Sequence, residues 1–236
     1  MTEKVLLVKL LMSCAYLVEQ NDRLILVDAG IPGEEQRILR SMATAGYGEL
    51  NLIFITHAHI DHYGSAAALR DLTGAPVAVH RADSQALARG ETRLGTARGI
   101  GKLVMRLFPA IQRIWPTPPT PADIILEDGD SLSTTGIDAT VLHTPGHTFG
   151  SSSLLVGDAA FVGDLLTTTR GHPRLQRFYA ESWPLLRTSL DRLIAAGPSI
   201  VYPGHGRKPL DPSDLLPLAS NELASNELAA PMTSWD

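Results

Sequence analysis

The chain has 236 residues, of which 44% are hydrophobic, and its formal net charge is −5. This length and hydrophobic content allow a buried core and exclude extensive disorder, while the negative charge argues against a nucleic-acid-binding protein. The single cysteine, Cys14, excludes an intramolecular disulfide and a multi-cysteine zinc site. A lone cysteine fits a reducing compartment, so we predict a cytoplasmic protein.

The first 20 residues contain an apolar run that a targeting signal would also show. Lys9 interrupts this run, and Glu3 stands where a signal peptide carries positive charge. We therefore predict a strand here. No run in the chain approaches the ~20 apolar residues that a membrane span needs, so we expect no stable membrane insertion.

Six apolar, β-branched runs follow, and each stops at a polar cluster, which is typical of buried strands with functional ends. The runs are "RLILVDAG" ending near Asp28, "LNLIFITHAH" near His57, "APVAVH" at His80, "DATVLHTPGH" near His147, "AAFVGD" at Asp164 and "SIVYPGHG" near His205. The segments 131–144 and 151–164 each predict two strands joined by a tight turn, at Gly136 and Gly157.

Helical patterns separate some of these strands. The segment 34–48 begins with acidic residues and ends at glycine, and the segment 64–74 is alanine-rich and also ends at glycine. The segment 182–198 has apolar residues at helical spacing and stops at Gly197 and Pro198. Mixed sheets covered by helices fit this alternation better than a uniform succession of parallel strands and crossover helices. We predict an α/β (α+β) protein with a single domain over residues 1–236.

Two segments depart from this pattern. Residues 89–122 contain the basic amphipathic stretch "KLVMRLFPAIQRIW" between glycine-rich and proline-rich chain, which indicates a lid-like insertion or a packed structural insertion. A membrane-surface helix is a weaker option because Pro109 is expected to interrupt it. Residues 217–236 carry two copies of "LASNE", which predict a short helix or a frayed tail without a catalytic role.

The histidines concentrate at the predicted strand ends. Strand ends meet at one edge of a sheet, so residues far apart in sequence can converge there, and imidazoles and carboxylates are common ligands of zinc and iron. The spacing allows one metal between His57, His59 and His147. It allows a second metal between Asp61, His62 and His205, with Asp164 shared by both.

The motifs "LVDAG", "THAHIDH", "TPGHT", "VGD" and "YPGHG", in this order, resemble those of the metallo-β-lactamase superfamily from about Tyr16 to about His205. The resemblance implies an αββα four-layer sandwich, in which two mixed sheets face each other and helices cover the outer faces. It also implies the same seven ligands. Asp28 is carried over from the first motif as a residue that supports the metal site without binding a metal.

The resemblance also narrows the branch of the superfamily. The enzymes that destroy β-lactams usually have cysteine or serine where this chain has Asp164, and the diiron flavoproteins have glutamate at the position of His59. The nuclease branch carries an extra inserted domain, which 236 residues can hardly hold. The glyoxalase II, lactonase and general hydrolase branch remains.

These ligands predict a metal-dependent hydrolase with two divalent cations. Zinc is the expected metal, and iron or manganese are alternatives. Paired cations ~3.5–4 Å apart can hold a bridging hydroxide that attacks a carbonyl carbon. We expect cleavage of an ester, thioester or lactone bond, and a phosphoester is a feasible substrate. Asp61 is assigned as a ligand and as the catalytic proton acceptor.

The expected partner is a small-molecule substrate, and the sequence does not predict an oligomeric state. The segment after Asp164 is a candidate for substrate contacts through Arg170, His172 or Tyr179, although a solvated loop explains it equally well. Two other functions stay open. One is a mononuclear iron persulfide dioxygenase, and the other is a non-catalytic metal-binding protein.

Overall fold

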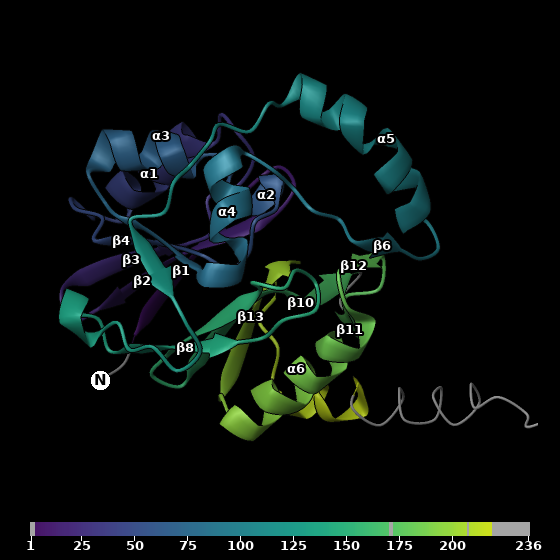
Figure 1. Ribbon diagram of the computed structural model, residues 1–236. Coiled ribbons are helices and arrows are strands. Elements are labelled where there is room, and N and C mark those ends of the chain that lie inside the picture. Colours follow the sequence, from purple (N-terminus) through teal and green to yellow (C-terminus); the bar gives the residue numbers. More distant parts are fainter. Residues whose placement is uncertain (1–2, 170–171, 207, 219–236) are drawn as a thin grey trace, which may run out of the picture.

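The structure, a computed structural model, describes residues 3–169, 172–206 and 208–218. Two β-sheets face each other, and helices cover their outer faces (Figure 1). The strands are β1 Lys4–Lys9, β2 Cys14–Gln20, β3 Arg23–Val27, β4 Leu52–Ile55, β5 Val77–His80, β6 Thr96–Ala97, β7 Ile124–Leu126, β8 Ala139–His143, β9 Ser152–Val156, β10 Ala159–Thr169, β11 His172–Leu175, β12 Tyr179–Ala180 and β13 Ile200–His205. The helices are α1 Glu35–Thr44, α2 Ile60–Tyr63, α3 Ala66–Thr73, α4 Arg81–Arg89, α5 Gly101–Ile114 and α6 Trp183–Ala196, with 3-10 turns η1 Ser133–Thr135 and η2 Pro212–Asp214.

Both large sheets are mixed. Within the described residues, the first sheet has the order β1-β2-β3-β4-β5-β7, in which β1, β2 and β3 are antiparallel and the strands from β3 onward are parallel. The second sheet joins β8, β9, β10 and β11 in antiparallel pairs, and β13 runs parallel to β10. A separate short pair, β6 with β12, lies beneath α5.

Alternating side chains of the strands build the layers. Along β4, Leu52 and Phe54 face the second sheet, whereas Ile53 and Ile55 face the helices. The same alternation places Phe161 of β10 between the sheets and its neighbours against α6. Because successive side chains of a strand point to opposite faces, a strand that is apolar on both faces needs a layer on each side. The predicted αββα sandwich is therefore confirmed.

Some elements differ from the prediction. The N-terminal run forms a hairpin of two strands, β1 and β2, rather than one strand. Gly136 does not join two strands but ends η1 in a left-handed conformation, whereas Gly157 does form the turn between β9 and β10. α4 was not predicted, and the C-terminal segment lies largely outside the described residues.

A bulge in β10 sets the position of the functional edge. The pairing register between β10 and β13 shifts on both sides of Gly163, which has a φ of +49°. A Cβ atom on Gly163 would lie 2.5 Å from Thr56 Oγ1, so the residue has no room for a side chain. Bulges bend a strand and re-aim its side chains, and this one directly precedes Asp164.

The layer between the sheets should dominate stability. The side chain of Phe161 is buried, and its ring packs against the rings of Tyr16 and Tyr202, with centroid distances of 5.4 and 4.9 Å. We expect Phe161→Ala to lower the free energy of unfolding by about 3–5 kcal/mol, because it leaves a cavity. Urea denaturation measures the change. Leu72→Ala, at an exposed leucine of α3, serves as the control and should change it by less than about 0.5 kcal/mol; equal effects would contradict this account of the core.

Candidate metal centre

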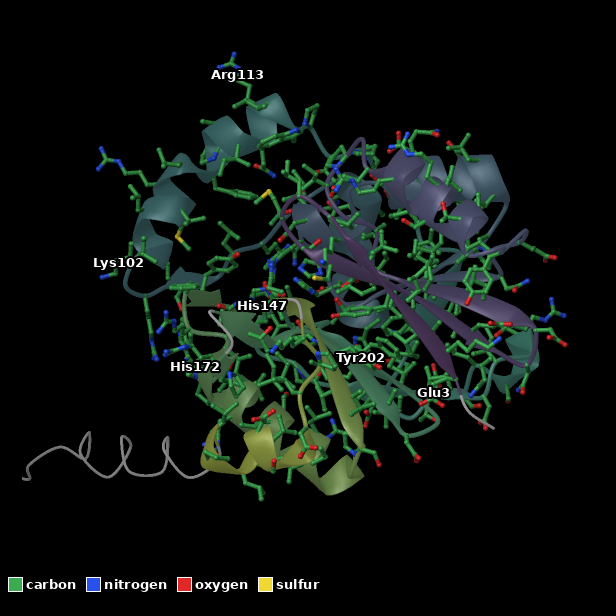
Figure 2. All side chains as sticks on the ribbon, turned by 180° about the vertical axis from the view of Figure 1, so that it is seen from behind. Glu3, Lys102, Arg113, His147, His172 and Tyr202 are labelled. Carbon is green, nitrogen blue, oxygen red and sulfur yellow. The ribbon has the colours of Figure 1, made fainter. Side chains whose placement is uncertain are left out.

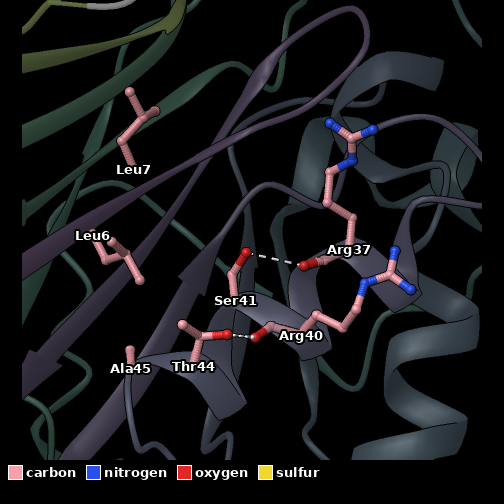
Figure 3. Close-up of a pocket in the computed structure, with 7 residues that line it drawn as sticks. All are labelled: Leu6, Leu7, Arg37, Arg40, Ser41, Thr44 and Ala45. Atoms are coloured by element: carbon pink, nitrogen blue, oxygen red, sulfur yellow. Dashed lines mark hydrogen bonds between the residues drawn. The ribbon is translucent and has the colours of Figure 1, made fainter.

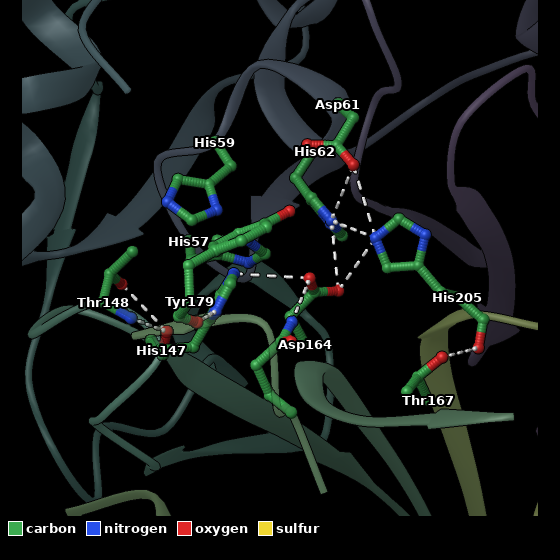
Figure 4. Close-up of polar contacts among 12 residues, drawn as sticks. His57, His59, Asp61, His62, His147, Thr148, Asp164, Thr167, Tyr179 and His205 are labelled. Carbon is green, nitrogen blue, oxygen red and sulfur yellow. Dashed lines mark hydrogen bonds and ion pairs between the residues drawn. The ribbon is translucent and has the colours of Figure 1, made fainter. Parts of the chain in front are cut away.

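Seven side chains from different parts of the chain meet at one edge of the sandwich (Figure 4). They are His57, His59, Asp61, His62, His147, Asp164 and His205. The residues 57–62 follow β4 and run into α2, His147 lies in the turn after β8, Asp164 is within β10, and His205 ends β13. These are the residues that the sequence predicts as metal ligands, and we refer to them as the cluster.

The first half of the cluster is a group of three imidazoles. His57, His59 and His147 each offer a ring nitrogen within 4.8 Å of the other two, and all three are buried. His59 Nε2 donates to the backbone oxygen of Arg93 at 2.8 Å, and His147 Nδ1 donates to that of Tyr179 at 3.2 Å. Each donation leaves the other ring nitrogen as a lone-pair donor that can bind a cation.

The second half combines Asp61, His62 and His205, whose donor atoms also lie within 4.8 Å of one another. His205 Nε2 is 3.3 Å from Asp61 Oδ2 and 3.4 Å from His62 Nε2. His62 donates from Nδ1 to Asp28 Oδ2 at 2.7 Å, so its Nε2 faces this group. His205 is the more open member, with a side chain that is 27% exposed.

Asp164 stands between the two halves. Its Oδ2 is 3.3 Å from His147 Nε2 in the first half, while its Oδ1 is 3.3 Å from His62 Nε2 and 3.2 Å from His205 Nε2 in the second. One carboxylate thus presents one oxygen to each half. This is the arrangement by which a carboxylate can bridge two cations.

The donor atoms of the cluster fit a cation better than they fit one another. Among the described residues, His57 Nε2, His147 Nε2 and Asp164 Oδ1 are buried and find no hydrogen-bond partner, although Asp164 Oδ1 is within ion-pair distance of two imidazoles. Leaving such atoms unsatisfied costs free energy. Nitrogen and oxygen atoms that point at a common position can offset this cost by binding a metal ion.

The pKa values of the histidines differ between the two halves of the cluster. Burial lowers the pKa of His57 well below its usual range and that of His147 to about 3, which keeps these imidazoles neutral, as metal ligands must be. For His62, burial lowers the pKa, but the carboxylates of Asp28, Asp61 and Asp164 outweigh burial and raise it to about 10. The second half therefore attracts positive charge, which a bound cation would supply.

Asp28 holds two of the histidines in place. It directly follows β3 with a φ of +62°, a left-handed conformation that aspartate tolerates better than most residues. Its carboxylate accepts from the backbone nitrogen of Thr56 at 2.9 Å, from the Thr56 hydroxyl and from His62. Because the Thr56 hydroxyl donates to Asp28, it accepts from His57 Nδ1 at 3.0 Å, which leaves Nε2 of His57 free to bind a cation.

A buried carboxylate that sequence reasoning missed joins the two histidine loops. Asp83 of α4 is buried and accepts from the backbone nitrogen of Ala58 at 2.7 Å, from the Thr148 hydroxyl at 2.7 Å and from the backbone nitrogen of Gly150 at 3.0 Å. The loop that carries His57 and the turn that carries His147 are thereby fixed to one side chain. Its position outside any motif gave no signal of this role.

The three candidates for substrate contacts have different positions. The ring of Tyr179 lies beside the cluster, with centroid distances of 5.8 Å to His59 and 5.4 Å to His147. His172 is exposed on β11 and belongs to none of the donor groups among the described residues. Arg170 lies outside the described residues. A neighbour that was not predicted, Gln176, donates to Asp164 Oδ2 at 3.3 Å.

A surface pocket of about 510 Å³ lies elsewhere, between β1 and α1 (Figure 3). It is lined by Leu6, Leu7, Arg37, Arg40, Ser41, Thr44 and Ala45. The hydroxyls of Ser41 and Thr44 donate to backbone oxygens of their own helix. None of the lining residues belongs to the cluster, so we do not assign the reaction to this pocket.

Comparison with known proteins places these observations in a family. Residues 8–205 match the metallo-beta-lactamase superfamily. The probable metallo-hydrolase YqgX of Bacillus subtilis is 29% identical over 196 residues, which cover 81% of this chain and 84% of that protein. An uncharacterized protein of Mycobacterium tuberculosis, Rv2581c, is 33% identical over 162 residues, or 65% of this chain and 68% of that protein.

Solved structures agree with the observed fold. The metallo-beta-lactamase family protein TTHA1429 of Thermus thermophilus superposes with a TM-score of 0.71 at 23% identity, covering 96% of this chain and 81% of that one. TTHA1623, solved in a di-iron-bound form, gives a TM-score of 0.65 at 29% identity and covers 89% of this chain and 95% of that one.

The contact between Asp28 and His62 should matter for metal affinity. We expect Asp28→Asn to weaken zinc binding about 10- to 100-fold, since partners that orient a ligating histidine typically contribute this much. Competition with a chromophoric chelator measures the affinity. Asp22→Asn is the matched control, because Asp22 also has a positive φ of +58° but is exposed. Unchanged affinity in Asp28→Asn would contradict the role given to Asp28.

Gly204 leaves room for the second half of the cluster. A Cβ atom there would lie 2.8 Å from His62 Cε1 and 2.9 Å from Asp164 Oδ1. We expect Gly204→Ala to displace one of these side chains and to reduce the bound metal, measured by elemental analysis, while the circular dichroism spectrum stays unchanged. Gly48→Ala, where a Cβ atom meets nothing within 4 Å, should keep the wild-type metal content. Full metal content in Gly204→Ala would show that the cluster tolerates the extra methyl group.

Proposed function

The chain belongs to the metallo-beta-lactamase superfamily, and we propose that it is a dinuclear metallo-hydrolase of the glyoxalase II and lactonase type, which cleaves an ester, thioester or lactone bond. The observation that carries the proposal is the position of Asp164, with one oxygen toward each half of a complete set of donors. A mononuclear enzyme needs only one half, and both halves are complete here.

Each cation has its own set of donors. Nε2 of His57, Nδ1 of His59 and Nε2 of His147 would hold the first, because the opposite nitrogen of each ring is already hydrogen-bonded. Asp61, Nε2 of His62 and Nε2 of His205 would hold the second, and Asp164 would serve both. Zinc suits this set of imidazoles and carboxylates, and iron or manganese are compatible with it; the di-iron form of TTHA1623 supports iron as an alternative.

When bound, two such cations lower the pKa of water to supply a nucleophile at neutral pH and polarise the substrate's carbonyl oxygen. The protein's own groups position that water. Burial raises the pKa of Asp61, but His62 and a hydrogen bond from His205 outweigh burial and lower it, so the carboxylate is ionised at neutral pH. It can therefore accept a proton from the water that adds to the carbonyl carbon.

The overall reaction consumes one water molecule. The water oxygen forms a bond to the carbonyl carbon, and the bond between that carbon and the leaving oxygen or sulfur breaks. The leaving group takes a proton from the water and becomes an alcohol or a thiol, and the acyl part becomes the acid; a lactone gives both groups on one molecule. We propose that the ring of Tyr179, beside His59 and His147, forms one wall of the substrate site. The hydrogen bond from Gln176 would keep Asp164 oriented during the reaction.

The test combines metal analysis with a panel of a thioester, an aryl ester and a lactone. We expect about two metal ions per chain and hydrolysis of at least one substrate class. Asp61→Asn should lower kcat/KM about 10²- to 10⁴-fold, the usual range for a lost acid–base group. Asp71→Asn, an exposed carboxylate of α3, should leave kcat/KM unchanged.

Three results would contradict the proposal. One iron per chain, with oxygen consumed in the presence of a persulfide, would indicate a dioxygenase. Two metals per chain without turnover of any substrate, phosphoesters included, would indicate a binding protein. Full activity in Asp61→Asn would remove the proposed role of that carboxylate.

A further inference from the structure

α5 stands apart from the layers that form the rest of the protein (Figure 1). Of its 14 residues, Gly101 alone is buried. The helix is joined to the body mainly at its start, where β6 pairs with β12 and the backbone nitrogen of Arg98 donates to the oxygen of Phe178. A helix of this length, with so little of it covered, presents most of its surface to the surroundings.

That surface is unusually apolar. Ile100, Leu103, Leu107 and Ile114 are 63, 55, 51 and 68% exposed, and Val104 is 36% exposed. Among the described residues, nearly half of the exposed large hydrophobic side chains belong to α5 and the residue before it. Spacings of three, four and seven residues place them along one face of the helix, so they form a continuous apolar stripe.

The same segment carries only positive charge. Residues 94–122 contain Arg98, Lys102, Arg106 and Arg113 and no aspartate or glutamate, although the whole chain has a net charge of −5. Lys102, Arg106 and Arg113 are exposed and recur at spacings of four and seven, next to the apolar stripe. Figure 2 shows the side chains of Lys102 and Arg113 pointing away from the body of the protein.

Pro109 does not divide this face, contrary to the prediction. α5 is continuous from Gly101 to Ile114, with Pro109 inside it. Its 14 residues extend for about 21 Å, less than the ~30 Å of a bilayer's hydrocarbon core. Among the described residues, none of the helices is long and apolar enough to cross a membrane. The helix is therefore suited to lie along a surface.

We propose that α5 and Ile100 form a docking surface for an anionic lipid membrane, with the apolar stripe in the acyl boundary and the three cations at the headgroups. A basic amphipathic helix with aliphatic residues on its other face is the typical design of such a contact. The charge disfavours the simplest other occupant, because two copies of this surface would bring cations against cations with no carboxylate between them. An anionic bilayer complements both the charge and the apolar stripe.

The docking surface does not depend on the proposed reaction, but it would orient the cluster. β6, which leads into α5, pairs with β12 through Tyr179 and Ala97. The ring of Tyr179 lies beside His59 and His147. A membrane held by α5 would thus lie on the side of the protein where the cluster and the proposed substrate wall are found.

Vesicle sedimentation tests the proposal with the intact protein. We expect the wild type to bind vesicles of equal phosphatidylglycerol and phosphatidylcholine, at about 0.15 M salt, at least roughly tenfold more tightly than vesicles of phosphatidylcholine alone. Lys102→Gln/Arg106→Gln should weaken binding to the anionic vesicles about thirtyfold, since each cation near an anionic leaflet contributes roughly fivefold. Leu103→Gln/Leu107→Gln should weaken it about tenfold or more.

Matched controls lie on other faces. Arg37→Gln/Arg40→Gln removes the same charge from α1, and Leu72→Gln/Leu216→Gln changes two other exposed leucines; both should bind like the wild type. Thermal unfolding and metal content should be the same in all variants. The proposal is overturned if the wild type remains in the supernatant, or if the α5 variants bind like the controls. It is also overturned if lipid-free sedimentation velocity shows a dimer that Leu103→Gln/Leu107→Gln dissociates while vesicles bind nothing.

Discussion

The structure depends on one electrostatic constraint, which is the burial of Asp164 among imidazoles that cannot all carry protons. Its two oxygens lie within 3.3 Å of ring nitrogens from His62, His147 and His205. In the apolar interior, lone pairs at such distances repel one another or remain unsatisfied unless protons or bound cations lie between them. In our proposal, metal binding would therefore stabilise the folded state as well as supply the chemistry, because the cluster exists only when the chain is folded.

Several residues around the cluster hold its donor atoms in place, although bringing these atoms together costs free energy. The bulge at Gly163 aims Asp164, and Asp28 with Thr56 orients His57 and His62. Whereas Asp28 orients histidine rings, Asp83 fixes the loops that carry the histidines. It accepts hydrogen bonds from the backbone nitrogens of Ala58 and Gly150, on both sides of the first half of the cluster. Two buried carboxylates that bind no metal in our proposal thus decide where the donors point.

The mixed sheets and the gathering of donors were predicted because both follow from local pattern, whereas the four-layer sandwich was predicted from the family resemblance of the motifs. Apolar runs that end in histidine place those residues at a sheet edge whatever the loops between them do. The role of Asp83 could not be predicted, because its partners at Ala58, Thr148 and Gly150 are backbone and hydroxyl groups brought close only by the fold. The β1–β2 hairpin was missed since its turn at residues 10–13 contains no glycine, proline or asparagine. The ligand roles themselves, and a lid role for residues 89–122, stay predictions.

α5 also carries a free-energy cost, but for the opposite reason. The buried charges of the cluster must be compensated inside the protein, whereas α5 exposes apolar area that the described residues do not cover. The side chains of Met105 and Phe108 in α5, and of Trp115 directly after it, are only partly buried, so contact with the body accounts for part of the apolar surface at most. The helix continues through Pro109, whose missing backbone N–H group costs stability. A surface outside the protein that accepts the apolar stripe would offset that cost, and an anionic bilayer is the environment that also accepts the cations beside the stripe.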